Sequence, residues 1–167
     1  MKKEESQAIL KNISKVKREK LGKSIPIEIF RVFRHFSQIY AEELLGEKAK
    51  NILFVNAGKE LGLTVGENLY NRSFERYIDN VKKFLKDKKI GILDITEISE
   101  NKLVFQLDEC ITCSGMDNIG KRICFFEVGL VAGIVEAYFG KSKKVLAKET
   151  KCNANGEGIC EVSVYIT

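Results

Sequence analysis

Several residue types are scarce in this chain of 167 residues, and each scarcity narrows the class of protein. There is no tryptophan, one proline and one histidine. The low proline content permits long helices, because proline interrupts the hydrogen bonding of a helix interior. A single histidine argues against a histidine-rich catalytic zinc site. Cysteine is absent from the first 109 residues, although five cysteines follow them.

Long uninterrupted apolar runs are also absent from the sequence. No stretch has the length needed to span a bilayer, and the N-terminus lacks the apolar core of a signal peptide. We therefore expect a cytoplasmic protein with no stable membrane insertion. In that reducing compartment, free thiols and metal ligands are more frequent than disulfides.

The excess of positive charge is mild, with 28 basic and 23 acidic residues and a formal net charge of +5. A nucleic-acid-binding domain of this size usually carries a more concentrated basic face, so no nucleic-acid partner is expected. The one dense basic stretch covers residues 15–23. It is typical of a solvated connector and, less often, of a contact with an acidic partner.

Apolar spacing in the N-terminal half indicates a series of helices. These helices are expected over residues 2–11, 27–46, 49–69 and 73–86. Within the third of them, Gly58, Gly62 and Gly66 recur at four-residue steps and therefore lie on one face. Because glycine weakens a helix, a close neighbour on that face is expected.

The period of the apolar residues changes in the C-terminal half. Strands are expected over 91–98, 103–107, 145–147 and 162–166, with a buried helix over 123–139. Strands joined by short turns pair antiparallel. The predicted fold is therefore α+β, with N-terminal helices plus a buried helix packed on a four-stranded antiparallel sheet. We expect one domain over residues 1–167, comprising a helical arm (1–23), a helical part (24–89) and a part with the sheet, buried helix and cysteines (90–167).

All five cysteines lie between positions 110 and 160. Cys110 and Cys113 form a Cys-x-x-Cys pair, which indicates either a metal knuckle or a redox pair. The alternative is that the cysteines are small buried hydrophobic residues, although such residues should scatter more evenly along the chain.

The other three cysteines come from distant parts of the chain. Cys152 and Cys160 flank an Asn-Gly turn signal at residues 155–156, and closing that hairpin brings their sulfurs toward each other. Cys124 falls at the start of the buried helix, where the helix dipole favours a thiolate. Neighbouring thiolates repel one another unless they are protonated or bind a cation, and zinc takes four tetrahedral donors.

The spacing leaves the fourth donor open, because Glu149, Cys110 and Cys113 are all candidates. Strict strand alternation places Glu149 and Cys152 on opposite faces. Glu149 can therefore join the site only through a β-bulge or a strand that ends near Lys151.

One long motif runs through the C-terminal third. It comprises Gly120-Lys-Arg-Ile-Cys124-Phe-Phe-Glu127-Val-Gly129-Leu-Val-Ala-Gly133, Glu149-Thr-Lys-Cys152 and Cys160-Glu-Val, with Cys113 before it and Gly140, Val145 and Gly156 between its parts. This motif resembles the 4-vinyl reductase domain family. The N-terminal half fits the helical portion of that family only by pattern.

The resemblance implies a ligand-binding fold similar to TRAPP vesicle-tethering subunits and the haem-NO-binding-associated domain, often dimeric through its helices. It implies binding of a small apolar, hydrocarbon-like molecule. Related sensor domains of aromatic-responsive regulators hold Zn2+ with Cys, Glu, Cys and Cys, and those ligands fall here on Cys124, Glu149, Cys152 and Cys160. Cys110 and Cys113 are possible further ligands.

Aromatic side chains of the helices are candidates for a ligand pocket, although core packing is the simpler account. The candidate pocket residues are Phe33, Phe36, Tyr40, Phe54, Phe105 and Val135. His35 is a conceivable haem ligand, but a partly buried, hydrogen-bonded histidine is the favoured interpretation. No catalytic residue is assigned, because no nucleophile motif or dinucleotide fingerprint is found.

Three functional hypotheses follow from these observations. The leading one is a zinc-containing sensor or carrier domain for an apolar, aromatic or lipid-like small molecule, acting as a homodimer. The second is a reductase-type enzyme for a vinyl or porphyrin-like substrate, although no hydride or electron source is evident. The third is a dimeric scaffold or tether.

Overall fold

The computed structural model describes residues 3–140 and 142–167. Its helices are α1 (Lys3–Ile13), α2 (Ile27–Leu45), α3 (Glu47–Leu69), α4 (Phe74–Asp87) and α5 (Phe125–Phe139). Its strands are β1 (Ile92–Ile98), β2 (Lys102–Asp108), β3 (Val145–Lys151) and β4 (Cys160–Ile166), with a 3-10 turn, η1 (Asn153–Asn155), between the last two. The expected order of four helices, hairpin, helix and hairpin is confirmed. Lys2, which the sequence places in the first helix, lies outside the described residues.

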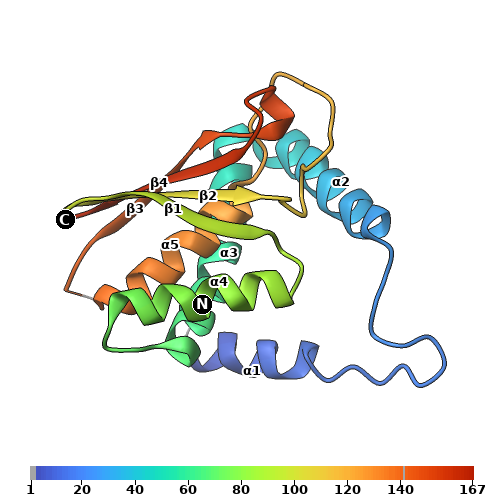
Figure 1. Ribbon diagram of the computed structural model, residues 1–167. Helices are drawn as coiled ribbons and strands as arrows, with labels where there is room; N and C mark the ends of the chain where they lie inside the picture. The colour runs from blue at the N-terminus through green and yellow to red at the C-terminus, as the bar shows by residue number, and fades with distance from the viewer. Residues whose placement is uncertain (1–2, 141) are drawn as a thin grey trace.

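The four strands form one antiparallel sheet in the order β1-β2-β4-β3. The helices lie on one side of this sheet, with α4 and α5 beneath it and α2 at one end (Figure 1). Leu103, Phe105 and Leu107 alternate along β2 and are buried, as the strand period predicts. Phe105 lies opposite Val162 of β4. The predicted α+β architecture is therefore confirmed.

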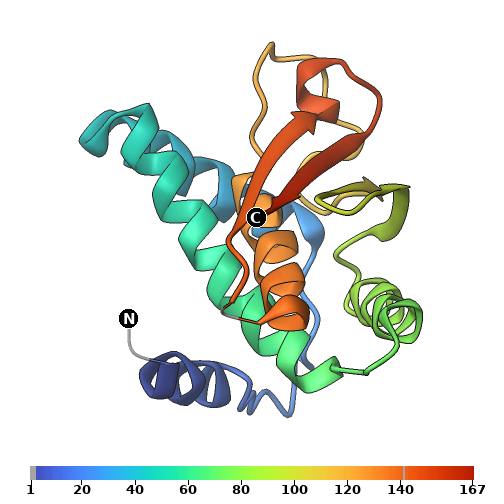
Figure 2. The same cartoon turned by 90° about the vertical axis from the view of Figure 1, so that its left-hand side faces the viewer.

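Helices α3 and α5 run side by side through a glycine-lined contact (Figure 2). A Cβ atom at Gly58 would overlap the carbonyl oxygen of Phe126, and one at Gly129 would overlap the carbonyl oxygen of Val55. Since the obstacles are backbone atoms, any larger residue would force the helices apart. The close neighbour expected for the glycine face is confirmed, and it fixes the position of the first turn of α5.

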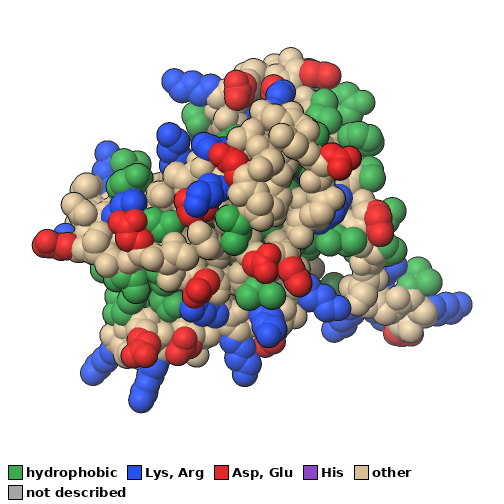
Figure 3. Space-filling view, turned by 45° about the horizontal axis from the view of Figure 1, so that its top comes forward, with side chains coloured by type: hydrophobic (Ala, Val, Ile, Leu, Met, Phe, Trp, Pro, Cys, Tyr) green, Lys and Arg blue, Asp and Glu red, His purple; other side chains and the backbone are tan. Residues whose placement is uncertain are grey.

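Helix α2 presents a broad apolar face to solvent. Its half-exposed or exposed side chains are Ile29, Val32, Phe33, Phe36, Ile39, Tyr40, Leu44 and Leu45, continued by Ile52 and Leu53 of α3. The exposed fraction reaches 73% at Phe33 and 83% at Leu44. Figure 3 shows hydrophobic side chains along the side of the molecule that α2 occupies. We call this set of ten residues the α2 face.

Within the described ranges, no helix combines the length and the apolar composition needed to cross a membrane.

Candidate metal centre and ligand cavity

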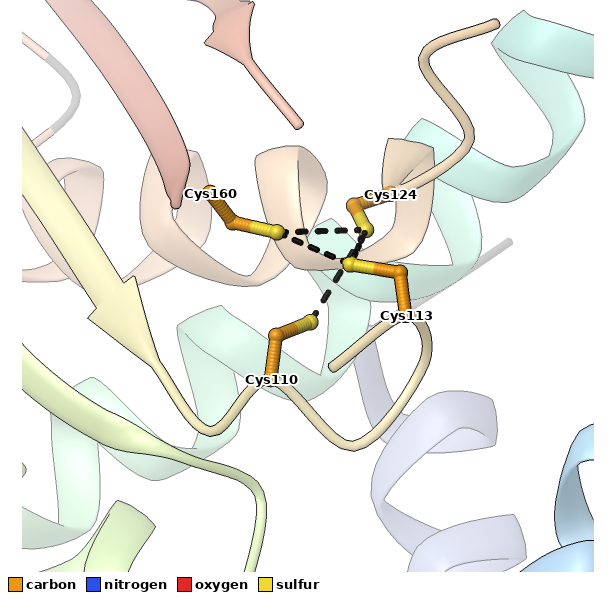
Figure 4. Close-up of side chains that lie close together, drawn as sticks. All are labelled: Cys110, Cys113, Cys124 and Cys160. Atoms are coloured by element: carbon orange, nitrogen blue, oxygen red, sulfur yellow. Dashed lines mark hydrogen bonds between the residues drawn. The ribbon is translucent and has the colours of Figure 1, made fainter. Parts of the chain in front are cut away.

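All five cysteines converge at one end of the sheet. Cys110 and Cys113 lie on the loop after β2, and Cys124 is the residue just before α5. Cys152 follows β3 directly, and Cys160 begins β4. Every one of these thiols is buried and free, and four of them point toward one another in Figure 4.

The sulfur–sulfur distances suit a tetrahedral metal ion. The Sγ atom of Cys124 lies 3.8 Å from the Sγ atoms of Cys110, Cys152 and Cys160. The Sγ atom of Cys113 lies 3.0 Å from that of Cys160 and 3.4 Å from that of Cys124. A tetrahedron of sulfurs around zinc, with Zn–S bonds of about 2.3 Å, has edges of roughly 3.8 Å. This buried cysteine cluster can therefore hold a metal ion.

The carboxylate of Glu149 joins the cluster because β3 is irregular at that point. The pairing of β3 with β4 shifts register between Glu149 and Lys151, and β3 ends at Lys151. This irregularity is the one that the alternation of a strand requires if Glu149 and Cys152 are to face the same site. One carboxylate oxygen of Glu149 and the sulfurs of Cys124 and Cys152 lie within 4.8 Å of one another. The two carboxylate oxygens also accept hydrogen bonds from the backbone N–H of Cys124, at 3.2 and 3.3 Å.

The electrostatics of the cluster favour a cation. Burial raises the pKa of Glu149 to about 10, and the charge of Cys152 contributes to that rise. Hydrogen bonds from Cys113 and Cys124 lower the pKa of Cys110, whereas bonds with Cys110 and Cys113 raise the pKa of Cys124. These opposite shifts arise because buried acidic groups in contact cannot all ionise together. A bound cation would remove that conflict, since it stabilises every ionised donor.

An ion pair braces the turn that joins Cys152 to Cys160. Arg122 donates two hydrogen bonds to the carboxylate of Glu157, at 2.6 and 3.0 Å. The same carboxylate accepts a hydrogen bond from the backbone N–H of Cys152 at 2.9 Å. The turn expected at residues 155–156 is present, with Gly156 in the left-handed conformation, but η1 precedes it. The hairpin is thus wider than a two-residue turn.

Polar side chains of α2 hold the Cys-x-x-Cys loop in place. Arg31 donates to the carbonyl oxygens of Ile111 and Ser114, at 2.8 Å each. The Nε2 atom of His35 lies 3.1 Å from the carbonyl oxygen of Thr112. His35 is partly buried and hydrogen-bonded, which confirms the interpretation favoured from the sequence. The position of α2 is thereby linked to the loop that carries the Cys-x-x-Cys pair.

A cavity of about 330 Å³ lies between α2, α3 and α5. Its lining residues are Phe30, Phe33, Arg34, Ser37, Phe54, Leu61, Ile90, Ile111, Phe126 and Glu127. Seven of these ten are apolar, which is the composition of a small-molecule site.

Two of the six candidate pocket residues, Phe33 and Phe54, line this cavity. Phe36 and Tyr40 do not, because they share the outward face of α2 and are exposed. Phe105 and Val135 do not line it either, since both are fully buried in the core around the sheet and α5. The structure therefore does not bring the six together in one pocket.

The polar residues of the cavity form a network that no sequence pattern indicates. Arg34 lies with its guanidinium 4.8 and 4.9 Å from the ring centres of Phe54 and Phe126. Its NH2 group donates to the carboxylate of Glu127 at 3.2 Å, and the hydroxyl of Thr112 donates to the same carboxylate at 2.6 Å. Arg34 and Glu127 are both buried. They lie 93 positions apart in the chain, so spacing gives no signal for this pair.

A second hollow, of about 890 Å³, lies between α2, α3, β3 and residues 119–123. Its charged lining residues are Glu42, Glu47, Lys50, Lys121, Arg122, Lys148 and Glu149. The mixture of both charge signs makes it less suited to an apolar molecule than the smaller cavity.

Comparison with known sequences gives a consistent family. The family model of the 4-vinyl reductase domain matches residues 103–165. The uncharacterized protein MJ0150 of Methanocaldococcus jannaschii is 34% identical over 146 residues, which cover 87% of this chain and 79% of that protein. The uncharacterized protein MJ1642 of the same organism is 30% identical over 148 residues, which cover 89% and 82%.

Three solved structures share the fold. The phenol-responsive sensory domain of the transcription activator PoxR, with phenol, has a TM-score of 0.65 at 12% identity and covers 95% of this chain and 89% of that one. A trafficking protein particle complex subunit 3 from Naegleria fowleri, covalently bound to palmitic acid, has a TM-score of 0.64 at 15% identity, with coverages of 84% and 95%. A vinyl-4-reductase family protein from Methanocaldococcus jannaschii has a TM-score of 0.62 at 20% identity, with coverages of 96% and 94%. The fold expected from the resemblance is confirmed.

Proposed function

The chain belongs to the 4-vinyl reductase domain family, and we propose that it is a small-molecule-binding sensor or carrier domain for an apolar or aromatic molecule. In this proposal residues 1–167 act as one domain. Two proteins of the same fold bind phenol and palmitic acid, which are both largely apolar. The shared fold supports a ligand of that general class.

The observation that carries the proposal is the cavity between α2, α3 and α5. Its volume of about 330 Å³ lies within the range of roughly 300–1,000 Å³ that is usual for small-molecule sites. Aromatic side chains from three helices, Phe30, Phe54 and Phe126 among them, line it. Burying an apolar molecule against these walls is favourable at roughly 25 cal/mol per Å² of area removed from water.

We further propose that the cysteine cluster holds Zn2+ as a structural ion. The proposed ligands are Cys124, Glu149, Cys152 and Cys160. Cys113 is the competitor for the place of Glu149, because its sulfur lies 3.4 and 3.9 Å from those of Cys124 and Cys152. Such an ion would tie β3, β4 and the start of α5 together, and it would remove the conflict between buried acidic groups.

The α2 face supports a homodimer as part of the same proposal. Patches of this kind on a monomer usually mark an interaction surface. The patch is built from one helix and the start of the next, so a two-fold axis could pair it with the same helix of a second copy. A dimeric scaffold would use this face as well, but it would not need the cavity.

Binding of ethylbenzene tests the cavity directly. We expect saturable binding with a dissociation constant on the order of 0.1–1 mM, measured by isothermal titration calorimetry. Ser37→Phe should abolish it, since Ser37 lines the cavity, makes no hydrogen bond to any other described residue, and would be replaced by a ring that fills the space. Asn56→Phe, at an exposed position of α3 away from the cavity, is the matched control.

Two results would count against the proposal. Unchanged binding by Ser37→Phe would place the ligand elsewhere, and no saturable binding by the wild type would remove the function itself. A flavin or nicotinamide that copurifies with the chain would favour the reductase hypothesis instead.

A further inference from the structure

The side chain of Arg34 is buried in the cavity wall with part of its hydrogen-bonding capacity unused. Only 6% of Arg34 is exposed to solvent, and its Nε–H has no acceptor among the described residues. A guanidinium has five N–H donors, and the hydrogen bond of this group to Glu127 uses NH2. Because a buried donor without a partner is costly, a group that supplies an acceptor at this position would be bound favourably.

The charge of this site is already balanced. Glu127 is as deeply buried as Arg34 and forms the ion pair with it at 3.2 Å. The second oxygen of Glu127 accepts the hydroxyl of Thr112 at 2.6 Å, which holds the carboxylate in place. An anionic ligand would leave one uncompensated negative charge in an apolar cavity, which is strongly disfavoured. A neutral acceptor avoids that cost.

The rigidity of Arg34 makes it suited to read such an acceptor. The ring centres of Phe54 on α3 and Phe126 on α5 lie 4.8 and 4.9 Å from the central carbon of the guanidinium. Contact with two aromatic rings, together with the bond to Glu127, restrains the plane of the group and hence the direction of its Nε–H. A donor that is held in place before binding loses little entropy when the ligand arrives.

We propose that Arg34 is the specificity-determining residue of this cavity and selects an uncharged aromatic or short aliphatic molecule with one carbonyl or hydroxyl oxygen. The inference rests on the proposed function, since it names the ligand class of the same cavity. The oxygen accepts the Nε–H of Arg34, and the apolar remainder packs against Phe30, Phe126 and Leu61.

Three probes of similar size test this assignment: ethylbenzene, acetophenone and benzoate. They differ in the group attached to the ring, which is apolar, a neutral acceptor or an anion. Arg34→Lys keeps a positive charge beside Glu127 but removes the planar Nε–H. We expect it to weaken acetophenone binding about tenfold while changing ethylbenzene binding less than twofold, by calorimetric titration. Arg76→Lys, at an exposed position of α4, should change neither.

A second variant guards against misfolding. Arg34→Met combined with Glu127→Gln removes both buried charges together, so no charge is left unpaired. It should also lose the preference for acetophenone, with a far-UV circular dichroism spectrum like that of the wild type. In the wild type, the NMR resonance of the Arg34 Nε–H should shift when acetophenone binds and stay in place when ethylbenzene binds.

Each other outcome overturns the inference. If Arg34→Lys weakens ethylbenzene and acetophenone equally, Arg34 only supports the shape of the cavity. If benzoate binds wild type most tightly and depends on Arg34, the ligand class is anionic. If ethylbenzene binds but acetophenone gains nothing from Arg34, the cavity functions without this residue, whereas failure of all three probes removes the proposed function together with the inference.

Discussion

The cysteine cluster and the cavity differ in the balance between polar groups and partners. The cluster has five sulfurs and the carboxylate of Glu149, which is more than the four donors that a tetrahedral ion takes. The cavity has the opposite imbalance, because Arg34 keeps an unused donor among mostly apolar walls. A surplus of metal-binding groups suits a permanently bound ion, whereas a shortage of partners suits a molecule that comes and goes.

The two regions meet at the first turn of α5. Cys124 precedes this helix and faces the other sulfurs, whereas Glu127, three residues later, faces Arg34. Thr112 connects them a second time, because its hydroxyl bonds Glu127 and it lies between Cys110 and Cys113. A change at either region is therefore transmitted to the other through very few contacts, which is the arrangement that a sensor domain requires.

Loss of the metal should have the largest effect. Cys124 is the sulfur that lies nearest to all the others, so Cys124→Ser should remove the ion and lower the free energy of unfolding by on the order of 5–10 kcal/mol. Elemental analysis of the purified protein and urea denaturation measure the two effects. Cys110→Ser is the control, since Cys110 lies outside the proposed ligand set. If Cys110→Ser loses the ion as readily, the set must be revised; if Cys124→Ser keeps both ion and stability, the cluster is ordinary core.

The glycine contact between α3 and α5 supports both regions, so its disruption should affect them together. A Cβ atom at Gly129 would lie 2.8 Å from the backbone nitrogen of Lys59 and overlap the carbonyl oxygen of Val55. We expect Gly129→Ala to destabilise the fold by about 3 kcal/mol, although alanine is the better helix former. Urea denaturation gives the value. Asn56→Ala, on the exposed side of α3, should be neutral or stabilising; an equally mild Gly129→Ala would mean that the two helices can separate at little cost.

The cysteine cluster was more accessible to sequence reasoning than the cavity. Cysteines are rare and chemically distinctive, so their gathering after residue 109 is visible in one sequence. Even the irregularity of β3 could be anticipated, because strand alternation alone would separate Glu149 from Cys152. The glycine steps of α3 likewise indicated a close neighbour before any partner helix was known.

The cavity could not be predicted, for two physical reasons. Its polar pair joins Arg34 to Glu127 across 93 positions, and only the packing of α2 on α5 brings them together. In addition, apolar periodicity shows which face of a helix avoids water but not what covers it. Phe36 and Tyr40 fit a pocket by pattern, yet they belong to the exposed α2 face.

That face provides a third test, since the cluster contains nothing comparable. Phe36→Glu places a charge within the α2 face and should raise the dissociation constant of a homodimer about tenfold or more, measured by analytical ultracentrifugation. Metal content should not change. Ile98→Glu, at an exposed apolar position of β1, is the control. A wild type that stays monomeric at about 100 μM, or a control that dissociates equally, would exclude this face as the dimer contact.

The smallest expected effect is a dependence on pH that is confined to the helical side. The carboxylate of Glu42 on α2 lies 2.8 Å from the Nζ atom of Lys50 on α3, and this hydrogen bond lowers the pKa of Glu42 below its usual 4.5. Because the folded pKa is depressed, the stabilisation is complete above pH 4.5 and is lost as the pH falls through the lower folded value. Glu42→Gln should therefore be less stable than wild type near neutral pH, and the difference should vanish toward about pH 3.

Urea denaturation at several pH values measures that difference. Glu43→Gln is the matched control, since Glu43 is exposed on the same helix and forms no ion pair with any other described residue. A gap between Glu42→Gln and wild type that stays constant down to about pH 3 would show that the charge of Glu42 is not its source. If the gap closes while the metal content is unchanged, α2 is loosened from α3 without disturbing the cysteines. The two regions would then be separable, and the link through Thr112 and Glu127 would be the contact by which one informs the other.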